Sequence, residues 1–395
     1  MCVAVAGCDP NNLGQIASKA RGTPHATAAS PSPGRPSPAD PPTTASAAAA
    51  CVAQVYDGMT QAQRVGQLFL VGVSADEAGP VTTAALQQYH FGSLLLNPSG
   101  EGVGALRAAT DHMQSLATAA NTGSARFFVA ANQEGGQILP LTGPGFSVIP
   151  SALTQGSWSV SDLRQQAAGW AGELRAAGVN LDLAPVMDVV PPGTASTNAP
   201  IGADDREFGF DPVTNGTHGA AFIQGMASAG VATSAKHFPG LGRVTGNTDF
   251  TPNVVDSVTT PADPYLSSFR AAIEAGVPFV MVALATYTRI DAARLAVFSP
   301  TVMRLLRSQL GFGGVIVSDD LGQAKAVAMI PAAQRALGFL SAGGDMITSQ
   351  DLGPAEEMAP AVLAQAAADP AFRAKVDTAA LRVLSAKQAY GLLPC

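Results

Sequence analysis

The sequence predicts an α/β fold, a single-domain (β/α)₈ barrel of the TIM type, and three observations support this prediction. From about residue 60 onward, short apolar runs alternate with longer segments of helical period, as in parallel strands joined by helical crossovers. Eight such units fill the remainder of the 395-residue chain, and this length suits a barrel. Polar residues follow several apolar runs, where a barrel places its active site. An open doubly wound sheet has similar local signals and remains the alternative.

The eight expected strands are short and apolar. In chain order they are QLFLVGV (67–73), FGSLLL (91–96), RFFVAA (126–131), VNLDLAPV (179–186), VATSAKHF (231–238), PFVMVAL (278–284), GVIVSD (314–319) and DMIT (345–348). The longest helical pattern between them, residues 161–178, has one apolar stripe at three- and four-residue spacing, made of Leu163, Ala167, Trp170, Leu174 and Ala177. We therefore expect Trp170 in the core, with sugar stacking as the alternative.

Polar side chains gather where the expected strands end. They are Asn132, Gln133 and Glu134 after the third strand, Asp188 after the fourth, Lys236 and His237 closing the fifth, Asp319 and Asp320 closing the seventh, and Asp345 opening the eighth. Charges at strand ends are costly unless they are paired or lie in a solvated cleft, so this pattern predicts a polar pocket. Salt bridges at a barrel rim would produce the same pattern, and this alternative stays open for Asp188, Asp345 and Glu134.

Composition excludes several classes of partner. The net charge is −7 and the 22 Lys and Arg residues are dispersed, so we expect no nucleic-acid partner. The body of the chain has no apolar run of the roughly 18 residues that a membrane-spanning helix needs. The five histidines are scattered and no Cys–His group has metal-ligand spacing, so we expect neither a metal site nor a cofactor.

The first eight residues, MCVAVAGC, resemble a bacterial lipobox, in which the final cysteine receives a lipid after cleavage. The lipidated residue would be Cys8. Seven residues precede it, fewer than the about 15 to 30 of an export signal, and we therefore expect the natural start codon further upstream. The alternative is a chance Ala-rich tail.

Residues 9–50 are expected to form a disordered tether, because residues 22–50 combine proline with Ser, Thr and Ala and cannot bury a core. The expected organisation is a residual export segment (1–8), this tether, and the barrel domain (51–395). We expect an exported protein of the cell envelope, lipid-anchored or secreted, that contacts a membrane only through Cys8.

Two further cysteines, Cys51 and Cys395, bracket the expected domain at its first and last residues. An exported compartment would let them oxidise, and the sequence therefore predicts a disulfide between them. Two unpaired surface thiols are the alternative.

Five motifs occur together, and in an order typical of one family. They are NQEGG, NLDLAPVMDV, IGADDREFG, KHFPGLG and VSDDL. Over about residues 59–390 the chain thus resembles glycoside hydrolase family 3, in its single-domain β-N-acetylglucosaminidase branch. The resemblance implies a retaining glycosidase that forms a covalent glycosyl-enzyme intermediate.

The resemblance also implies roles for individual residues. Asp319, at the end of its strand, stands at the position of the nucleophile, where a rigid strand end would hold it for attack. Asp320 is expected to be structural. The sugar-binding positions are Asn132, Arg206, Lys236 and His237, side chains that can together donate and accept several hydrogen bonds.

Three positions depart from the family pattern. Asn132 replaces an aspartate, and Pro140 stands where peptidoglycan-recycling enzymes have an arginine. In the glycine-rich stretch KHFPGLGRVTGNTDFTP, the family has Asp-Ser-His and this chain reads Asn247, Thr248 and Asp249. The family's acid/base histidine and the aspartate that orients it are thus both absent.

Asp249 occupies the position of that histidine, and a carboxyl can both donate and remove a proton. We predict that Asp249 is the acid/base, which requires a pKa about two units above the usual value of about 3.9. Burial beside Asp319 would supply this rise. The alternative is that Asp249 only caps the following turn.

The sequence therefore predicts a monomeric exo-acting hydrolase that removes β-linked N-acetylglucosamine from cell-wall fragments or other amino-sugar polymers. A β-glucosidase is one alternative. A phosphorylase is less favoured, because Asp249 would repel phosphate. A third alternative is a lipoprotein that binds amino sugars without cleaving them.

Overall fold

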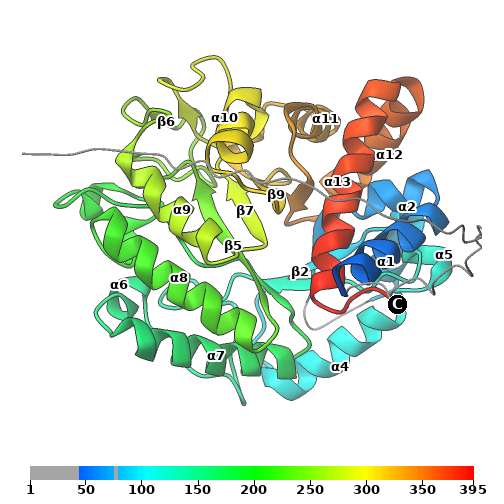
Figure 1. Cartoon of the computed structure of the whole chain (residues 1–395), viewed down its shortest axis with the longest axis horizontal. Helices are drawn as coiled ribbons and strands as arrows, with labels where there is room; N and C mark the ends of the chain where they lie inside the picture. The colour runs from blue at the N-terminus through cyan, green and yellow to red at the C-terminus, as the bar shows by residue number, and fades with distance from the viewer. Residues whose placement is uncertain (1–43, 75–78) are drawn as a thin grey trace, which may run out of the picture. The chain divides into compact units, whose positions relative to one another are not determined.

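Eight parallel strands close into a barrel in the computed structural model, which describes residues 44–74 and 79–395 (Figure 1). Around the barrel the strands follow the order β1 (Phe69–Val73), β10 (Met346–Ser349), β9 (Val315–Asp320), β7 (Phe279–Val282), β5 (Ala232–Phe238), β4 (Leu181–Asp182), β3 (Phe128–Ala131) and β2 (Ser93–Leu96). The predicted barrel is confirmed, and the doubly wound alternative is wrong because the sheet has no free edge.

All eight expected strands are present, and most are shorter than their apolar runs. The largest difference is in β4, expected over residues 179–186 but continuous as a strand only at Leu181–Asp182. Pro185 follows shortly after, and proline has no N–H to donate to a neighbouring strand. Beyond the proline, Val186 forms an isolated parallel bridge to Lys236 of β5, and Leu183, Ala184 and Val186 are buried.

Helical crossovers connect the strands and cover the barrel (Figure 1). The helices are α2 (Gln61–Gly66), α3 (Pro80–Tyr89), α4 (Gly102–Ser115), α5 (Ala119–Thr122), α6 (Ala152–Gln155), α7 (Val160–Ala176), α8 (Pro212–Ser228), α9 (Ser267–Glu274), α10 (Pro300–Arg304), α11 (Ala332–Ala342), α12 (Leu352–Ala368) and α13 (Pro370–Ala389). The expected apolar stripe lies on α7, where Trp170 is 4% exposed and its ring centroid lies 6.3 Å from that of Phe222. Trp170 is therefore a core residue, as predicted.

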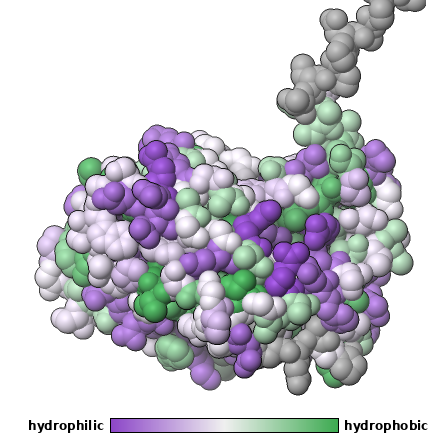
Figure 2. Space-filling model, turned by 90° about the horizontal axis from the view of Figure 1, so that it is seen from below, coloured by the Kyte–Doolittle hydropathy of each residue, from purple (hydrophilic) through white to green (hydrophobic). Residues whose placement is uncertain are grey.

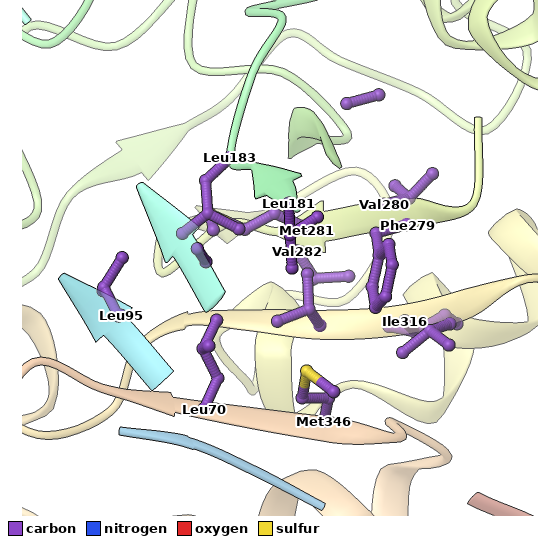
Figure 3. Packing of buried hydrophobic residues seen from close by; sticks show 14 of the residues in the cluster. Leu70, Leu95, Leu181, Leu183, Phe279, Val280, Met281, Val282, Ile316 and Met346 are labelled. Atoms are coloured by element: carbon purple, nitrogen blue, oxygen red, sulfur yellow. The ribbon is translucent and has the colours of Figure 1, made fainter. Parts of the chain in front are cut away.

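The interior of the barrel is filled by apolar side chains from opposite strands (Figure 3). Leu70, Leu95, Phe279 and Met346 come from four different strands and are buried. Toward the carboxyl ends of the strands this packing stops, and Leu95 and Met281 also line a pocket. The apolar core thus forms the floor beneath the polar residues described below.

The folded region begins earlier than predicted. Helix α1 spans Thr44–Gly58, so residues 44–50 are helical and their assignment to the tether was wrong. Alanine has the highest helix propensity, and α1 packs along α13 (Figure 1). The predicted lipidation site Cys8 and residues 9–43 of the predicted tether lie outside the described residues. None of the described helices is both long and apolar enough to span a membrane.

The surface of the described region is mixed in character. Figure 2 shows one face, on which hydrophobic residues form small patches separated by hydrophilic residues. The apolar area on this face is therefore divided rather than continuous.

A disulfide joins Cys51 in α1 to Cys395, with the two Cα atoms 5.8 Å apart. Around it lies a small apolar cluster that includes Val52, Val55 and Leu384. The bond ties the first described helix to the end of the chain across 344 residues of sequence.

Reduction of this disulfide is expected to lower the stability of the protein. In the chain-entropy model the closed loop restricts the unfolded chain, and loss of a native disulfide typically costs about 2–5 kcal/mol. Urea unfolding of oxidised protein should therefore show a higher midpoint than that of Cys51→Ser. Two freely alkylated thiols at Cys51 and Cys395 in unreduced protein would contradict the pairing.

Candidate active site

A pocket of about 770 Å³ opens at the carboxyl ends of the strands, within the size range of small-molecule sites. The six residues predicted to form the site all line it, and they come from the ends of three strands and from two loops. They are Asn132, Arg206, Lys236, His237, Asp249 and Asp319. The fold therefore brings together residues separated by nearly two hundred positions of sequence.

A buried carboxylate, Glu134, is the centre of the ion pairs in this pocket. It accepts hydrogen bonds from Arg206 Nε at 2.9 Å and Nη2 at 2.8 Å, and its Oε1 lies 2.5 Å from Lys236 Nζ. Burial alone would raise the pKa of Glu134, but the charges of Arg206 and Lys236 outweigh it and lower the pKa to about 2. Glu134 is therefore ionised at neutral pH and holds both cations in place.

The remaining donors of these side chains are available to a ligand. Lys236 Nζ also donates to Asn132 Oδ1 at 2.9 Å. Among the described residues, the Asn132 amide N–H groups and one N–H of Lys236 therefore remain for a ligand. Arg206 Nη1 donates to the Pro200 carbonyl at 2.6 Å. With the two bonds to Glu134, three of its five N–H groups are used, and the other two have no partner among the described residues. The pocket thus offers several fixed donors, as recognition of hydroxyl and amide groups requires.

Asp182, a second buried carboxyl, lies behind this cluster at the end of β4. Its Oδ1 accepts the backbone N–H of Gln133 at 2.9 Å, and among the described residues its Oδ2 has no hydrogen-bond partner. Burial raises the pKa of Asp182 to about 7. Glu134 and Asp182 are therefore both buried, but their charge states differ. Cations hold Glu134 ionised, whereas no cation is paired with Asp182 in the described region.

We expect Glu134→Gln to lower the free energy of unfolding at pH 7 by about 3–5 kcal/mol, because it leaves two buried cations without their counter-charge. Asp182→Asn removes a buried carboxyl of the same kind and should cost much less, since no cation depends on it. Urea denaturation of both variants measures the difference, and equal losses would contradict the assignment.

The pH dependence of stability provides a second comparison for Asp182. Its raised pKa means that the folded protein holds a proton that the unfolded chain releases between about pH 4 and about pH 7. Stability from this group is therefore present at low pH and is lost as pH rises through about 7. This dependence should be absent from Asp182→Asn.

His237 is held by a third buried carboxylate, Asp188. Asp188 Oδ2 lies 2.7 Å from His237 Nδ1, and its Oδ1 accepts the backbone N–H groups of His237 at 3.0 Å and Leu241 at 2.8 Å. This contact directs the opposite ring nitrogen, Nε2, away from Asp188. The peptide bond between Lys236 and His237 is cis, and both side chains line the pocket.

The two carboxyls at the end of β9 have different environments. Asp320 is buried and accepts three backbone N–H groups, from Gly322, Gln323 and Gln350, at 2.9–3.0 Å. Asp319 is half-buried, lines the pocket and accepts the N–H of Asp320 at 2.8 Å. Asp320 therefore holds the loop that follows β9, whereas Asp319 is open to a ligand.

Asp249 lies at the mouth of the pocket, in a turn that a neighbouring side chain caps. Asn247 Oδ1 accepts the N–H of Asp249 at 2.9 Å, and the carbonyl of Asp249 accepts the N–H of Lys325 at 3.1 Å. Within the described part of the chain, the Asp249 carboxyl itself accepts no hydrogen bond. The capping role considered for Asp249 thus belongs to Asn247.

The environment of Asp249 favours its protonated form. Surrounding protein atoms and the negative charge of Asp319 raise the pKa of Asp249 to about 6, against the opposing influence of His237 and Arg206. Asp249 is an exposed residue overall, so solvent reduces both the burial penalty and the repulsion from Asp319, and both causes act in the same direction.

Sequence reasoning missed part of the site. Glu134 and Asp188 were left open as rim salt bridges, and the structure instead makes them the groups that orient Arg206, Lys236 and His237. Asp182 was not singled out, although its place in the motif NLDLAPVMDV was a signal.

Asp345 does not belong to the pocket with which the sequence grouped it, and the alternative of a structural salt bridge holds. It lies just before β10, at the opposite end of the strand from the pocket, and pairs with Arg307 and Arg382. Over residues 44–74 and 79–395, no group of three or more His, Cys, Asp or Glu side chains is arranged to hold a metal ion.

Comparison with known sequences identifies close relatives of the barrel. Residues 60–386 match the model of the glycosyl hydrolase family 3 N-terminal domain. A curated β-hexosaminidase of Stenotrophomonas maltophilia (strain K279a) is 35% identical over 208 residues, 50% of this chain. One of Vibrio cholerae serotype O1 is 36% identical over 211 residues, 53% of this chain. The chain spans 58% and 61% of the lengths of these two relatives.

Solved structures agree over a longer part of the chain. A β-N-acetylhexosaminidase from Beutenbergia cavernae DSM 12333 is 48% identical with a TM-score of 0.82, covering 83% of this chain and 98% of that one. A glycoside hydrolase family 3 β-N-acetylglucosaminidase from Paenibacillus sp. str. FPU-7 is 26% identical with a TM-score of 0.73, covering 85% of this chain and 63% of that one. The structural likeness to these two enzymes thus extends over more than four fifths of this chain.

Proposed function

Since this chain belongs to glycoside hydrolase family 3, as its motifs predicted, we propose that it is a retaining glycosidase that removes terminal β-linked N-acetylglucosamine. The names of its relatives, β-hexosaminidase and β-N-acetylglucosaminidase, support this substrate class. The observation that carries the proposal is that two carboxyls, those of Asp319 and Asp249, line the same pocket. The pKa of Asp249 is raised to about 6.

In the first step, Asp319 attacks the anomeric carbon and forms an ester bond with the sugar, while the bond to the leaving oxygen breaks. Asp249 gives its proton to that oxygen, so the leaving group departs as a neutral alcohol. Position on a strand end and the hydrogen bond from Asp320 N–H fix the Asp319 carboxylate. Asp249 lies in a hydrogen-bonded turn at the mouth of the pocket, on the side from which the leaving group would depart.

In the second step, Asp249, now ionised, removes a proton from water, and the resulting hydroxide equivalent displaces Asp319 from the anomeric carbon. The sugar leaves with its original β configuration, and Asp249 regains the proton that it lost. Lys236, Arg206 and Asn132 would hold the sugar hydroxyls through both steps, each oriented through Glu134 or its partner Lys236.

Product analysis with aryl glycosides tests the proposal against its alternatives. We expect release of N-acetylglucosamine from its 4-nitrophenyl β-glycoside, and far slower release of glucose from the matching glucoside. Added inorganic phosphate should not yield sugar 1-phosphate, because the ionised Asp249 would face a phosphate dianion. Binding of N-acetylglucosamine by calorimetry without any turnover would instead indicate a non-catalytic binding protein.

We also infer that the protein is exported and attached to a membrane by a lipid on Cys8. The lipobox-like sequence, the proline-rich segment and the disulfide between Cys51 and Cys395 support this proposal. Detergent-phase partitioning of the protein produced in its native host tests it, and equal partitioning of the wild type and Cys8→Ala would contradict it.

A further inference from the structure

The inner and outer parts of the pocket differ in charge. Among the described residues that line it, the permanently cationic side chains are Arg206 and Lys236, and both are committed to Glu134 at the floor. The outer lining on the side of β2 and β3 is neutral and includes Asn97, Ser99, Gln137, Leu139, Pro140 and Thr142. A ligand group beyond the floor therefore meets uncharged amides, hydroxyls and apolar carbon.

The loop that carries Asp249 adds an aromatic side chain and negative charge to the outer pocket. Phe250 lines the pocket and is 78% exposed, and it is the only aromatic residue among the exposed large hydrophobic side chains of the described region. Asp249 and Asp204 line the same pocket. The outer pocket thus combines an open phenyl ring with carboxyls, and its lining supplies no unpaired cation.

The backbone around Phe250 is held in place although its ring is open to solvent. The N–H groups of Phe250 and Thr251 donate to the carbonyl of Asn247 at 3.1 and 2.8 Å. The neighbouring Thr248 accepts the N–H of Ala326 at 3.0 Å, from the loop that follows β9. The ring is therefore presented from a hydrogen-bonded turn, next to the carboxyl that would protonate the leaving group.

A single exposed hydrophobic side chain is ordinary on a protein surface, but Phe250 belongs to the lining of the pocket that holds Asp249 and Asp319. The C–H face of a pyranose is apolar, so it can cover the ring and remove it from water. We propose that Phe250 is the platform of a leaving-group site that accepts an uncharged sugar and rejects a sugar bearing a carboxylate. The inference rests on the proposed glycosidase function, whose substrate class it narrows to neutral amino-sugar oligomers.

Charge is the reason for the rejection. A carboxylate on the leaving sugar would lie near Asp249 whenever that group is ionised and near Asp204, and the lining offers it no free cation. Lys325 is the cation to consider outside the lining, because its backbone N–H binds the Asp249 carbonyl. Its side chain is exposed and does not line the pocket, and its contribution can be tested separately.

The test compares three substrates of the wild-type protein. They are N,N′-diacetylchitobiose, the disaccharide N-acetylglucosaminyl-β-1,4-N-acetylmuramic acid, and N-acetylglucosaminyl β-fluoride, which has no leaving sugar. We expect kcat/KM for the neutral disaccharide to exceed that for the carboxylate-bearing one by about tenfold or more at pH 7, which corresponds to about 1.4 kcal/mol. Equal rates, or a preference for the acidic disaccharide, would overturn the inference.

Variants test whether the Phe250 ring binds the leaving sugar. In Phe250→Ala the ratio of kcat/KM for diacetylchitobiose to that for the fluoride should fall about tenfold, and Phe250→Trp should restore it. Val213→Ala, which alters another exposed hydrophobic residue outside the pocket lining, should leave the ratio unchanged. An unchanged ratio in Phe250→Ala would also overturn the inference.

The failure of this inference is distinguishable from that of the proposed function. If the wild type does not release N-acetylglucosamine even from the fluoride, the glycosidase proposal itself is wrong. If it cleaves the fluoride but prefers the acidic disaccharide, only the leaving-group site is wrong. Loss of that preference in Lys325→Ala would then identify Lys325 as the cation responsible.

Discussion

Asp319→Ala should reduce turnover of every β-N-acetylglucosaminide by about 10⁴-fold or more, because removal of a catalytic nucleophile commonly costs this much. Without the carboxylate no covalent intermediate can form, whatever the leaving group. The side chain is half-buried and its contacts are few, so we expect the fold to be retained. Steady-state kinetics with circular dichroism and calorimetric binding of N-acetylglucosamine separate chemistry from folding.

The neighbouring Asp320 is the matched control for this prediction. Its carboxylate accepts three backbone N–H groups, so Asp320→Ala should lower stability through the loss of these bonds.

A mechanism-based 2- or 5-fluoro sugar should label wild-type protein on one peptide, at Asp319. A label on any other residue would reject Asp319 as the nucleophile.

Asp249→Ala should slow hydrolysis of a natural disaccharide by about 10²–10⁴-fold, the usual contribution of general acid–base catalysis. An activated aryl glycoside should lose much less in the first step, since its leaving group needs no proton. Azide should then accelerate the second step in this variant, because an anionic nucleophile needs no base. The product would be the β-glycosyl azide, which chromatography and mass spectrometry identify.

The pH profile provides an independent measurement of the same group. Asp249 must be protonated to donate, and its pKa is raised to about 6, so activity on disaccharides should fall as pH rises through about 6. This alkaline limb should flatten in Asp249→Ala.

Asn247→Ala is the control for the loop, because it removes the side chain that caps the turn and leaves Asp249 present. It should keep the position of the alkaline limb, even if its rate falls. Full activity of Asp249→Ala on a disaccharide, with an unchanged pH profile, would show that the acid/base lies elsewhere.

The amino-acid pattern alone favoured the barrel, and the closed sheet of the structure excluded the doubly wound alternative. Apolar runs such as residues 67–73 and 314–319 are local, and the alternation of strands with helices constrains the topology to few choices. The strand ends followed from the same pattern, which is why Asn132, Lys236 and Asp319 were expected at one pocket. The pattern failed at two places. Strand β4 is shorter than its apolar run and ends before Pro185, and the alanines of helix α1 were assigned to the tether.

The roles of the buried charges were decided only by the tertiary structure. Glu134 and Asp182 are both acidic residues near strand ends, and nothing in their local sequence separates them. Their pKa values differ, about 2 against about 7, because Glu134 lies against Arg206 and Lys236 while Asp182 is buried without such a contact. Pairing of this kind depends on distances between chain segments far apart in sequence.

The behaviour of the loop that carries Asp249 also depends on contacts between segments far apart in sequence. Its sequence showed that a carboxyl stands where the family has a histidine, and this was enough to predict an acid/base and the pKa that it would need. Whether that pKa is reached depends on how close Asp319 lies, and whether Phe250 is buried or open depends on how the turn docks on the loop after β9. Sequence thus determined which groups are present, and packing determined their charge and exposure, because electrostatic energy and solvation depend on three-dimensional distance.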